Sequence, residues 1–231
     1  MTKEKTKKRS KLKVEDLGKA GLHFGHGTSK RNLGMEPYIE GVKGPIHIID
    51  LKKTIEKMEE ALDFFEKVSK EEKTILVVAT RPQMKDLVEE FSKECSLPYI
   101  TNRWIGGFIS NFSEVKKRIK YLNDLLEKKE KGELDKYTKK ERVEIDREIE
   151  RLEKKFGGVK KLTALPDVLF VIDVGKDYLA LKEARDKGIE TVGVVDTDND
   201  PKVVDYPIPA NDDAISSVRF ILEKVKEVIK K

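Results

Sequence analysis

The sequence contains a single cysteine and no long apolar stretch. Cys95 alone cannot form a disulfide within the chain, which is typical of proteins from reducing compartments. No apolar run approaches the roughly 18 residues that a membrane span requires, and the first residues lack the apolar stretch of a signal peptide. We therefore expect a cytoplasmic protein that makes no membrane contact.

Motifs for nucleotide binding and hydrolysis are also missing. The chain has no GxGxxG, no GxxxxGK[ST] and no GxSxG, so the usual phosphate cradles and the usual hydrolase nucleophile are absent. Asp196, Asp198 and Asp200 alternate like the start of a calcium loop. Pro201 and Pro207 stand where that loop needs glycine and glutamate, which excludes an EF-hand.

Positive charge is concentrated in two segments. Residues 1–13 contain seven basic residues and one acid, and residues 113–161 contain seventeen basic residues and twelve acids. The whole chain carries +5, so the remaining residues are net acidic. Local clusters matter most for attraction to phosphate, because charges more than about 10 Å apart are largely screened at physiological salt. A high charge content alone would indicate only a soluble surface, but its segregation indicates contact with nucleic acid.

Apolar runs alternate with amphipathic segments along most of the chain. Continuous, β-branched apolar runs predict buried strands at 45–50, 74–80, 97–101, 167–173 and 190–196. The segments between them carry apolar residues every three or four positions, which predicts helices. This alternation predicts an α/β fold with a five-stranded parallel sheet that helices cover on both faces.

A central segment departs from this alternation. Apolar residues recur there in two stretches with the same spacing: Val115, Ile119, Leu122 and Leu126, then Ile145, Ile149, Leu152 and Phe156. A polar run separates them, and Thr138 with Glu141 has the spacing of a capping box. Two narrow seams predict an antiparallel helical hairpin, a coiled coil that projects from the body. The expected organisation is a basic flexible tail (1–13), an α/β body (14–112 and 158–231) and a hairpin insertion (113–157).

Two sets of polar residues offer candidate chemistry. His23 and His26 are potential metal ligands, but the surrounding glycines indicate a loop and no nearby cysteine or glutamate would complete a tetrahedral site. We therefore favour contacts with the rest of the protein or with RNA for both histidines over metal binding. Asp173 and Asp196 follow two strands at the carboxyl edge of the sheet, where α/β proteins bind ligands. We favour a role in holding the following loops over catalysis.

The stretch NRWIGGFISNF (102–112) has the composition of an RNA contact. Arg103, the only tryptophan, a Gly-Gly turn and Asn111 are groups that engage the RNA backbone and unstacked bases. Trp104 would equally suit a core position at a strand end.

Eight motifs in this sequence resemble one family, bacterial protein two of the small ribosomal subunit. They are AGLHFGH (20–26), MEPYIEG (35–41), IHIIDLKKT (46–54), NRWIGGFISNF (102–112), LPDVLFVID (165–173), KEARDKGI (182–189), VVDTDNDP (194–201) and IPANDDA (208–214). They follow the family's order over about residues 14–225. Two departures are the extension at 1–13, longer than the usual family start, and the stretch 27–35, which lacks the tryptophan common in that loop.

The resemblance implies a flavodoxin-like, three-layer α/β/α body with strand order 2-1-3-4-5 and a protruding helical hairpin. It implies a structural, non-enzymatic constituent of the small ribosomal subunit in translation. Such a protein binds small-subunit ribosomal RNA near the junction of head and body and supports the docking of small-subunit protein one. The resemblance implies no cofactor and no metal, and we expect no homo-oligomer.

Together with the charge pattern, the resemblance predicts RNA contacts in the tail, the glycine-rich loop and the hairpin. The candidate residues are Lys7, Lys8, Arg9, Lys11, His23, His26, Lys30, Arg31, Arg103, Trp104, Asn111, Lys116, Lys117, Arg118, Lys139, Lys140 and Arg142. Two other classes stay open. A Mg²⁺-dependent phosphoryl-transfer or receiver-like domain would use Asp173 and Asp196 with a third carboxylate at the same edge, which the sequence does not obviously supply. A hairpin adaptor that binds only protein is disfavoured by the lysine-rich tail.

Overall fold

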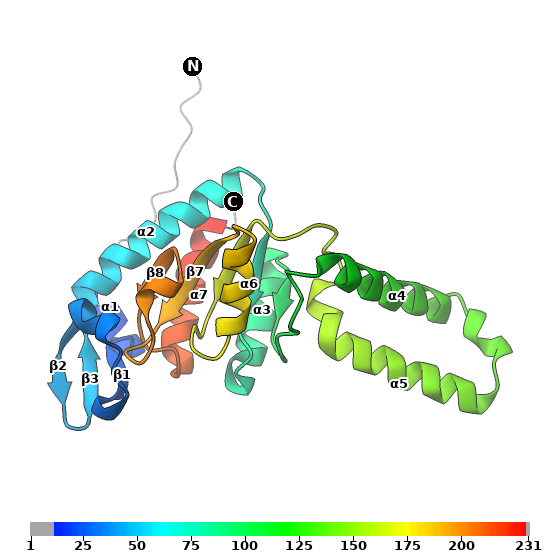
Figure 1. Ribbon diagram of the computed structural model, residues 1–231, viewed down its shortest axis with the longest axis horizontal. Helices are drawn as coiled ribbons and strands as arrows, with labels where there is room; N and C mark the ends of the chain where they lie inside the picture. The colour runs from blue at the N-terminus through cyan, green and yellow to red at the C-terminus, as the bar shows by residue number, and fades with distance from the viewer. Residues whose placement is uncertain (1–11, 230–231) are drawn as a thin grey trace, which may run out of the picture.

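The computed structural model describes residues 12–229, whose strands form one large and one small sheet (Figure 1). The large sheet has the strand order β5-β4-β6-β7-β8, with all neighbours parallel. Its strands are Ile75–Val78 (β4), Tyr99–Ile100 (β5), Val168–Val171 (β6), Glu190–Val195 (β7) and Tyr206–Pro209 (β8). Counted along the chain within this sheet, the order is 2-1-3-4-5, which confirms the prediction.

Helices cover both faces of the large sheet, so the body has three layers. One face packs against α2 (Leu51–Lys70), α3 (Lys85–Cys95) and α7 (Ile215–Ile229), with α1 (Val14–Ala20) beside them. Phe65 of α2 meets Phe170 of β6 edge to face, with ring centroids 5.1 Å apart. The other face packs against α6 (Tyr178–Asp186) and the loop that follows β5. Successive residues of β6 alternate between the two cores, as a strand buried on both faces requires.

Two strand assignments from the sequence need correction. The run at 45–50 forms β3 (Ile46–Ile49), which pairs antiparallel with β1 (Phe24–Gly27) and β2 (Ile39–Lys43) in the small sheet. The fifth parallel strand is instead β8, whose Tyr-Pro-Ile-Pro sequence does not predict a strand. Proline cannot donate to a ladder, and β8 accommodates two prolines because it lies at the edge of its sheet.

Two long helices, α4 (Phe112–Glu130) and α5 (Lys139–Phe156), extend side by side from the body between β5 and β6 (Figure 1). We call this pair the arm. Thr138 caps α5: its backbone N–H donates to Glu141 Oε2 at 2.8 Å, and its hydroxyl accepts from the Glu141 N–H at 3.5 Å. The buried seam consists of Val115, Ile119, Leu122, Leu125, Ile149, Leu152 and Phe156.

The seam of the arm continues into the body. Val115 and Phe156, at its root, belong to the same apolar cluster as Leu169 and Val171 of the sheet and Leu181 of α6. The arm is therefore anchored in the core that lies under α6.

The body begins earlier than the predicted tail boundary at residue 13. Leu12 is 7% exposed and packs in the core on the α2 side. Short 3₁₀ turns connect several elements, at Thr28–Lys30, Leu33–Tyr38, Pro82–Met84, Glu133–Lys136, Gly157–Val159 and Pro201–Val203. Among the described residues, no helix is both long and apolar enough to cross a bilayer.

Candidate functional site

The predicted RNA-contacting residues fall on separate parts of the molecule. Those of the tail, Lys7, Lys8, Arg9 and Lys11, lie outside the described residues. The basic candidates of the body and arm all have exposed side chains: Lys30, Arg31, Arg103, Lys116, Lys117, Arg118, Lys139, Lys140 and Arg142. Asn111 is also exposed and precedes α4 directly.

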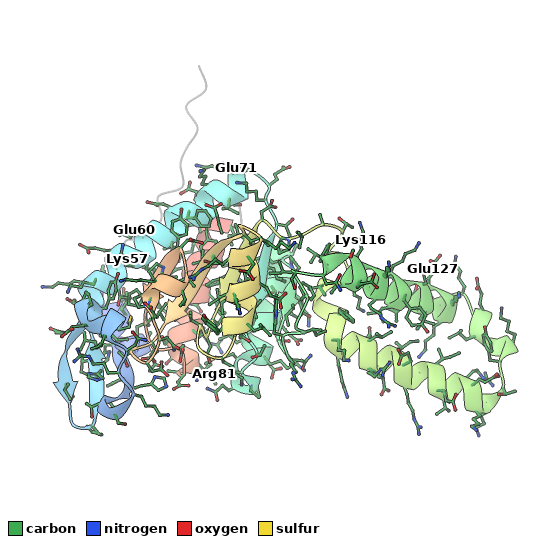
Figure 2. The ribbon with its side chains drawn as sticks, in the orientation of Figure 1. Lys57, Glu60, Glu71, Arg81, Lys116 and Glu127 are labelled. Atoms are coloured by element: carbon green, nitrogen blue, oxygen red, sulfur yellow. The ribbon has the colours of Figure 1, made fainter. Side chains whose placement is uncertain are left out.

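The six basic candidates of the arm form two clusters. Lys116, Lys117 and Arg118 lie in the first turns of α4, at the root of the arm, where Figure 2 labels Lys116. The other three lie in the first turn of α5, at the tip. A helix of 19 residues such as α4 is about 28 Å long, so the structure does not bring the two clusters together.

Acids are interleaved with the cations of the arm. Lys117 pairs with Glu114 at 2.6 Å, and Lys131 pairs with Glu127, which Figure 2 labels on α4. Lys129 reaches across to Asp146 of α5 at 2.6 Å. These contacts neutralise part of the positive charge that the sequence assigns to the arm.

Trp104 is a core residue. Its side chain is 7% exposed, and its indole N–H donates to Glu183 Oε1 at 3.1 Å. The ring also packs against Phe108, with centroids 5.2 Å apart. Trp104 therefore presents no open face on which a base could stack, contrary to the expectation from the sequence.

Glu183 organises the loop that the tryptophan begins. Its carboxylate accepts hydrogen bonds from the backbone N–H groups of Gly107 (2.8 Å), Ile109 (3.0 Å) and Ser110 (3.1 Å). Burial alone would raise the pKa of Glu183, but these donors hold its pKa below the ordinary value. The sequence carries one signal for this role, because Glu183 falls on the apolar face of α6 defined by Ala180, Leu181 and Ala184.

His26 lies in a cluster of acids at the carboxyl edge of the large sheet. Its Nδ1 is 3.2 Å from Asp196 Oδ2, and its Nε2 is 3.3 Å from Asp213 Oδ2 and 3.8 Å from Asp198 Oδ2. The Asp196 carboxylate beside it raises the pKa of His26 to about 8. His23 lies apart from these acids: it packs on the Phe24 ring, and burial lowers its pKa.

Strand β1 reaches this edge because Gly25 has no side chain. A Cβ atom at this position would lie 2.5 Å from Cγ2 of Thr197. The close approach lets the backbone N–H of His26 donate to the Thr197 hydroxyl at 2.9 Å. The small sheet thus places His26 beside the loop that follows β7.

Asp212 and Arg81 complete the acidic cluster. Asp212 is fully buried, with Arg81 Nη2 3.3 Å from its Oδ1, and Arg81 also pairs with Asp173 and Asp213. Figure 2 labels Arg81 at the lower rim of the body. Burial, together with the nearby charges of Asp173 and Asp196, raises the pKa of Asp212 to about 8. The carboxylates of the cluster outnumber its two cationic side chains.

Two overlapping sets of these side chains could hold a divalent metal. His26 with Asp196 and Asp198 is one, and His26 with Asp212 and Asp213 is the other; within each set the ligand atoms lie within 4.8 Å of one another. A histidine nitrogen with carboxylate oxygens is a donor set that suits Zn²⁺. The sequence argument against a metal at His26 considered only nearby cysteine and glutamate, whereas the aspartates that lie beside His26 come from distant segments.

The strand-end aspartates hold loops, as the sequence favoured. Asp173 accepts from the backbone N–H of Lys176 at 2.9 Å, and Asp196 accepts from that of Thr197 at 2.5 Å. The structure adds a third carboxylate at this edge that is not obvious from the sequence, because Asp212 and Asp173 both contact Arg81. The geometry therefore defines an α/β protein with a helical arm. The aspartates at the ends of its strands accept hydrogen bonds from the backbone of the loops that follow.

The comparison with known proteins identifies the family. A family model for ribosomal protein S2 matches residues 17–231. The chain is 43% identical over 216 residues to the small ribosomal subunit protein uS2 of Coprothermobacter proteolyticus, with 94% of this chain and 81% of that protein covered. It is 42% identical to the uS2 proteins of Nitratiruptor sp. and Dictyoglomus turgidum, again over 94% of this chain and over 81% and 88% of theirs.

The chain therefore belongs to the ribosomal protein S2 family. Members of this family are structural components of the ribosome and not enzymes. A non-enzymatic role agrees with the structure, in which Asp173 and Asp196 accept hydrogen bonds from loop backbone N–H groups.

Proposed function

We propose that this protein is a structural constituent of the small ribosomal subunit in the cytoplasm, and that it binds small-subunit ribosomal RNA through its basic tail, its glycine-rich loop and its arm. The observation that carries the proposal is the family match over nearly the whole length of the chain. The basic residues of the body and arm support it, because their side chains lie at the surface, where phosphate attracts positive charge. The proposal includes contact with neighbouring ribosomal proteins and support for the docking of small-subunit protein one.

Sedimentation of a cell lysate through a sucrose gradient tests this function. We expect the chain to sediment with small subunits and to stay with them at moderate salt. A chain that remains at the top of the gradient under these conditions would contradict a ribosomal role.

Removal of residues 1–11 tests the contribution of the tail. Each phosphate that a basic residue neutralises adds about 0.7–0.9 to the slope of log affinity against log salt. The segment contains six basic residues and one acid, so its loss should weaken binding to depleted subunits and flatten the salt dependence. An unchanged slope would mean that the tail does not contact RNA. Residues 12 and 13 are retained because Leu12 belongs to the core.

A further inference from the structure

In the segment that contains helix α6, two of the acidic side chains are buried and the basic ones are exposed, which is not the case in the arm. The acids Asp177 and Glu183 are 2% and 6% exposed. Both are occupied inside the molecule: Asp177 accepts from the Thr80 hydroxyl at 2.8 Å, and Glu183 holds the 104–110 loop. The basic residues of the same segment, Lys176, Lys182 and Arg185, are all exposed. Turning the acids inward leaves a positive outer surface on a segment whose formal charge is near zero.

The basic residues of this segment have no ion-pair partner within the part of the chain that the structure describes, although Arg185 lines a hollow with Glu190 and Asp205. Among residues 12–229, none of the three forms an ion pair; Arg185 donates one hydrogen bond, to the carbonyl oxygen of Lys202 at 3.2 Å. On α6 itself, Asp186 is the one acid with an exposed side chain. This contrasts with α2, where Lys57 pairs with Glu60 at 2.8 Å, and with the paired lysines of the arm.

An aromatic ring lies among these cations. Tyr178 is 52% exposed and Leu179 is 49% exposed, so both large side chains of the first turn of α6 are open to solvent. Tyr178, Lys182 and Arg185 are spaced by four and three residues, so they share the outer face of α6. Figure 1 shows α6 in front of the sheet, facing the viewer.

The loop after β5 borders this surface. A Cβ atom on Gly106 would lie 3.7 Å from Leu179 Cδ2, so the Gly-Gly turn adjoins the first turn of α6. Gly106 is exposed and has no side chain, which allows a ligand to approach the backbone closely. Glu183 fixes this loop from below and therefore fixes the border of the surface.

We infer that the α6 surface, formed by Lys176, Tyr178, Leu179, Lys182 and Arg185, binds a single-stranded segment of ribosomal RNA. An unpaired base stacks on the Tyr178 ring, and the three cations contact the flanking phosphates. An aromatic ring flanked by cations is how proteins bind unstacked RNA. Exposed lysines favour RNA over a protein partner, because lysine is depleted in protein interfaces. The inference rests on the proposed function, since it assumes that the chain contacts RNA, and it transfers the stacking role expected of Trp104 to Tyr178.

Rebinding to small subunits that have been depleted of this chain tests the inference. Full-length variants are compared at about 50 and 200 mM salt. Tyr178→Leu, which keeps apolar bulk and removes the ring, should weaken rebinding about 5- to 150-fold, the range for loss of one base stack. Tyr178→Phe should restore it. The triple variant K176Q/K182Q/R185Q should flatten the salt slope by about 2 to 3, one phosphate for each cation.

A matched control removes three charges elsewhere. The variant K52Q/K67Q/K70Q changes exposed lysines of α2, which covers the opposite face of the sheet, and should rebind as the parent chain does. All variants should melt as the parent does, because the changed side chains are exposed. If Tyr178→Leu melts early, Tyr178→Phe and the triple variant decide the question.

The outcomes separate the inference from the function on which it rests. A parent chain that does not rebind depleted subunits would contradict the proposed function. If it rebinds and the α6 variants match it, the α6 surface is not a contact. If the variants rebind weakly but ultraviolet cross-linking joins the α6 peptide to a protein, the partner is protein and the inference is wrong. Weak rebinding together with a cross-link from Tyr178 to RNA supports it.

Discussion

Acidic side chains hold the structure together in the α/β body, whereas in the arm they pair with lysines at the surface. In the body, Glu183, Asp177 and Asp212 are buried and hold backbone or cationic groups in place. In the arm, Glu114 and Glu127 are exposed and pair with lysines one turn away on the same helix. A buried carboxylate fixes geometry because its loss leaves donors unsatisfied, whereas an exposed pair contributes little to stability. The comparison shows that the count of acids in a segment does not determine its surface charge.

Replacing Glu183 with alanine should have the largest effect on stability. The change leaves the N–H groups of Gly107, Ile109 and Ser110 and the Trp104 indole without their acceptor. Unsatisfied buried donors cost about 1–3 kcal/mol each, and partial access of water to the loop limits the sum, so we expect a loss of about 3–5 kcal/mol in urea unfolding. Glu127→Ala on the arm is the control and should leave the unfolding midpoint unchanged. Equal midpoints for the two variants would remove the contrast between body and arm.

Adding Zn²⁺ should raise the melting temperature of the protein through the acidic cluster. A ligand that binds only the folded state at about 100 times its Kd contributes about 2.7 kcal/mol. The variant His26→Ala lacks the ligand that both candidate sets share and should not respond. If Zn²⁺ does not raise the melting temperature of the parent protein either, the cluster does not bind the metal. Arg81 and protonation alone would then offset the negative charge of its carboxylates.

The same cluster should make stability depend on pH when a chelator is present. The pKa of His26 is raised from 6.5 to about 8, so its stabilising contribution is complete below about pH 6.5 and is lost as the pH rises through 8. Asp212 acts in the same direction: its pKa is raised from 3.8 to about 8, so stability falls as the pH rises from about 4 to 8, because the unfolded carboxyl ionises while the buried one keeps its proton. We expect the melting temperature to fall by a few degrees between pH 6.5 and 8.5. His26→Asn should reduce the fall, and an unchanged profile in that variant would contradict the assignment.

Shortening the arm should affect stability least. Replacing residues 120–151 with a Gly/Ser linker keeps Val115, Ile119 and Phe156, which pack at the root. The body should then melt cooperatively near the parent temperature, since loop-closure entropy changes slowly with length. Circular dichroism measures the melt, and recovery in purified small subunits measures incorporation, which we expect to be lost. Removal of all of residues 113–157 should destabilise the body, because it takes away side chains that pack in the core under α6.

Regular features of this fold could be predicted from the sequence, and long-range ones could not. Continuous apolar runs identified β4, β6 and β7, and the spacing of apolar residues identified both helices of the arm. The strand β8 was missed because Pro207 and Pro209 argue against a strand unless its place at the sheet edge is known. The acidic cluster was missed for another reason: His26 and Asp196 are far apart in sequence, and only the antiparallel small sheet brings them together. Trp104 was ambiguous because nothing local distinguishes a core ring from an exposed one.

The arm has a consequence for the order in which the chain folds. Strands β4 and β6 must pair, at Ile75 with Val168, before the central sheet exists, and the whole arm lies between them in sequence. The contacts of the arm are local, and local helical contacts form in microseconds, before distant strands meet. Once α4 and α5 are paired, their roots lie together, and the flexible chain that remains between β5 and β6 is much shorter than the sequence suggests. A formed arm therefore lowers the entropic cost of closing the parallel sheet, and it should speed folding more than it stabilises the folded state.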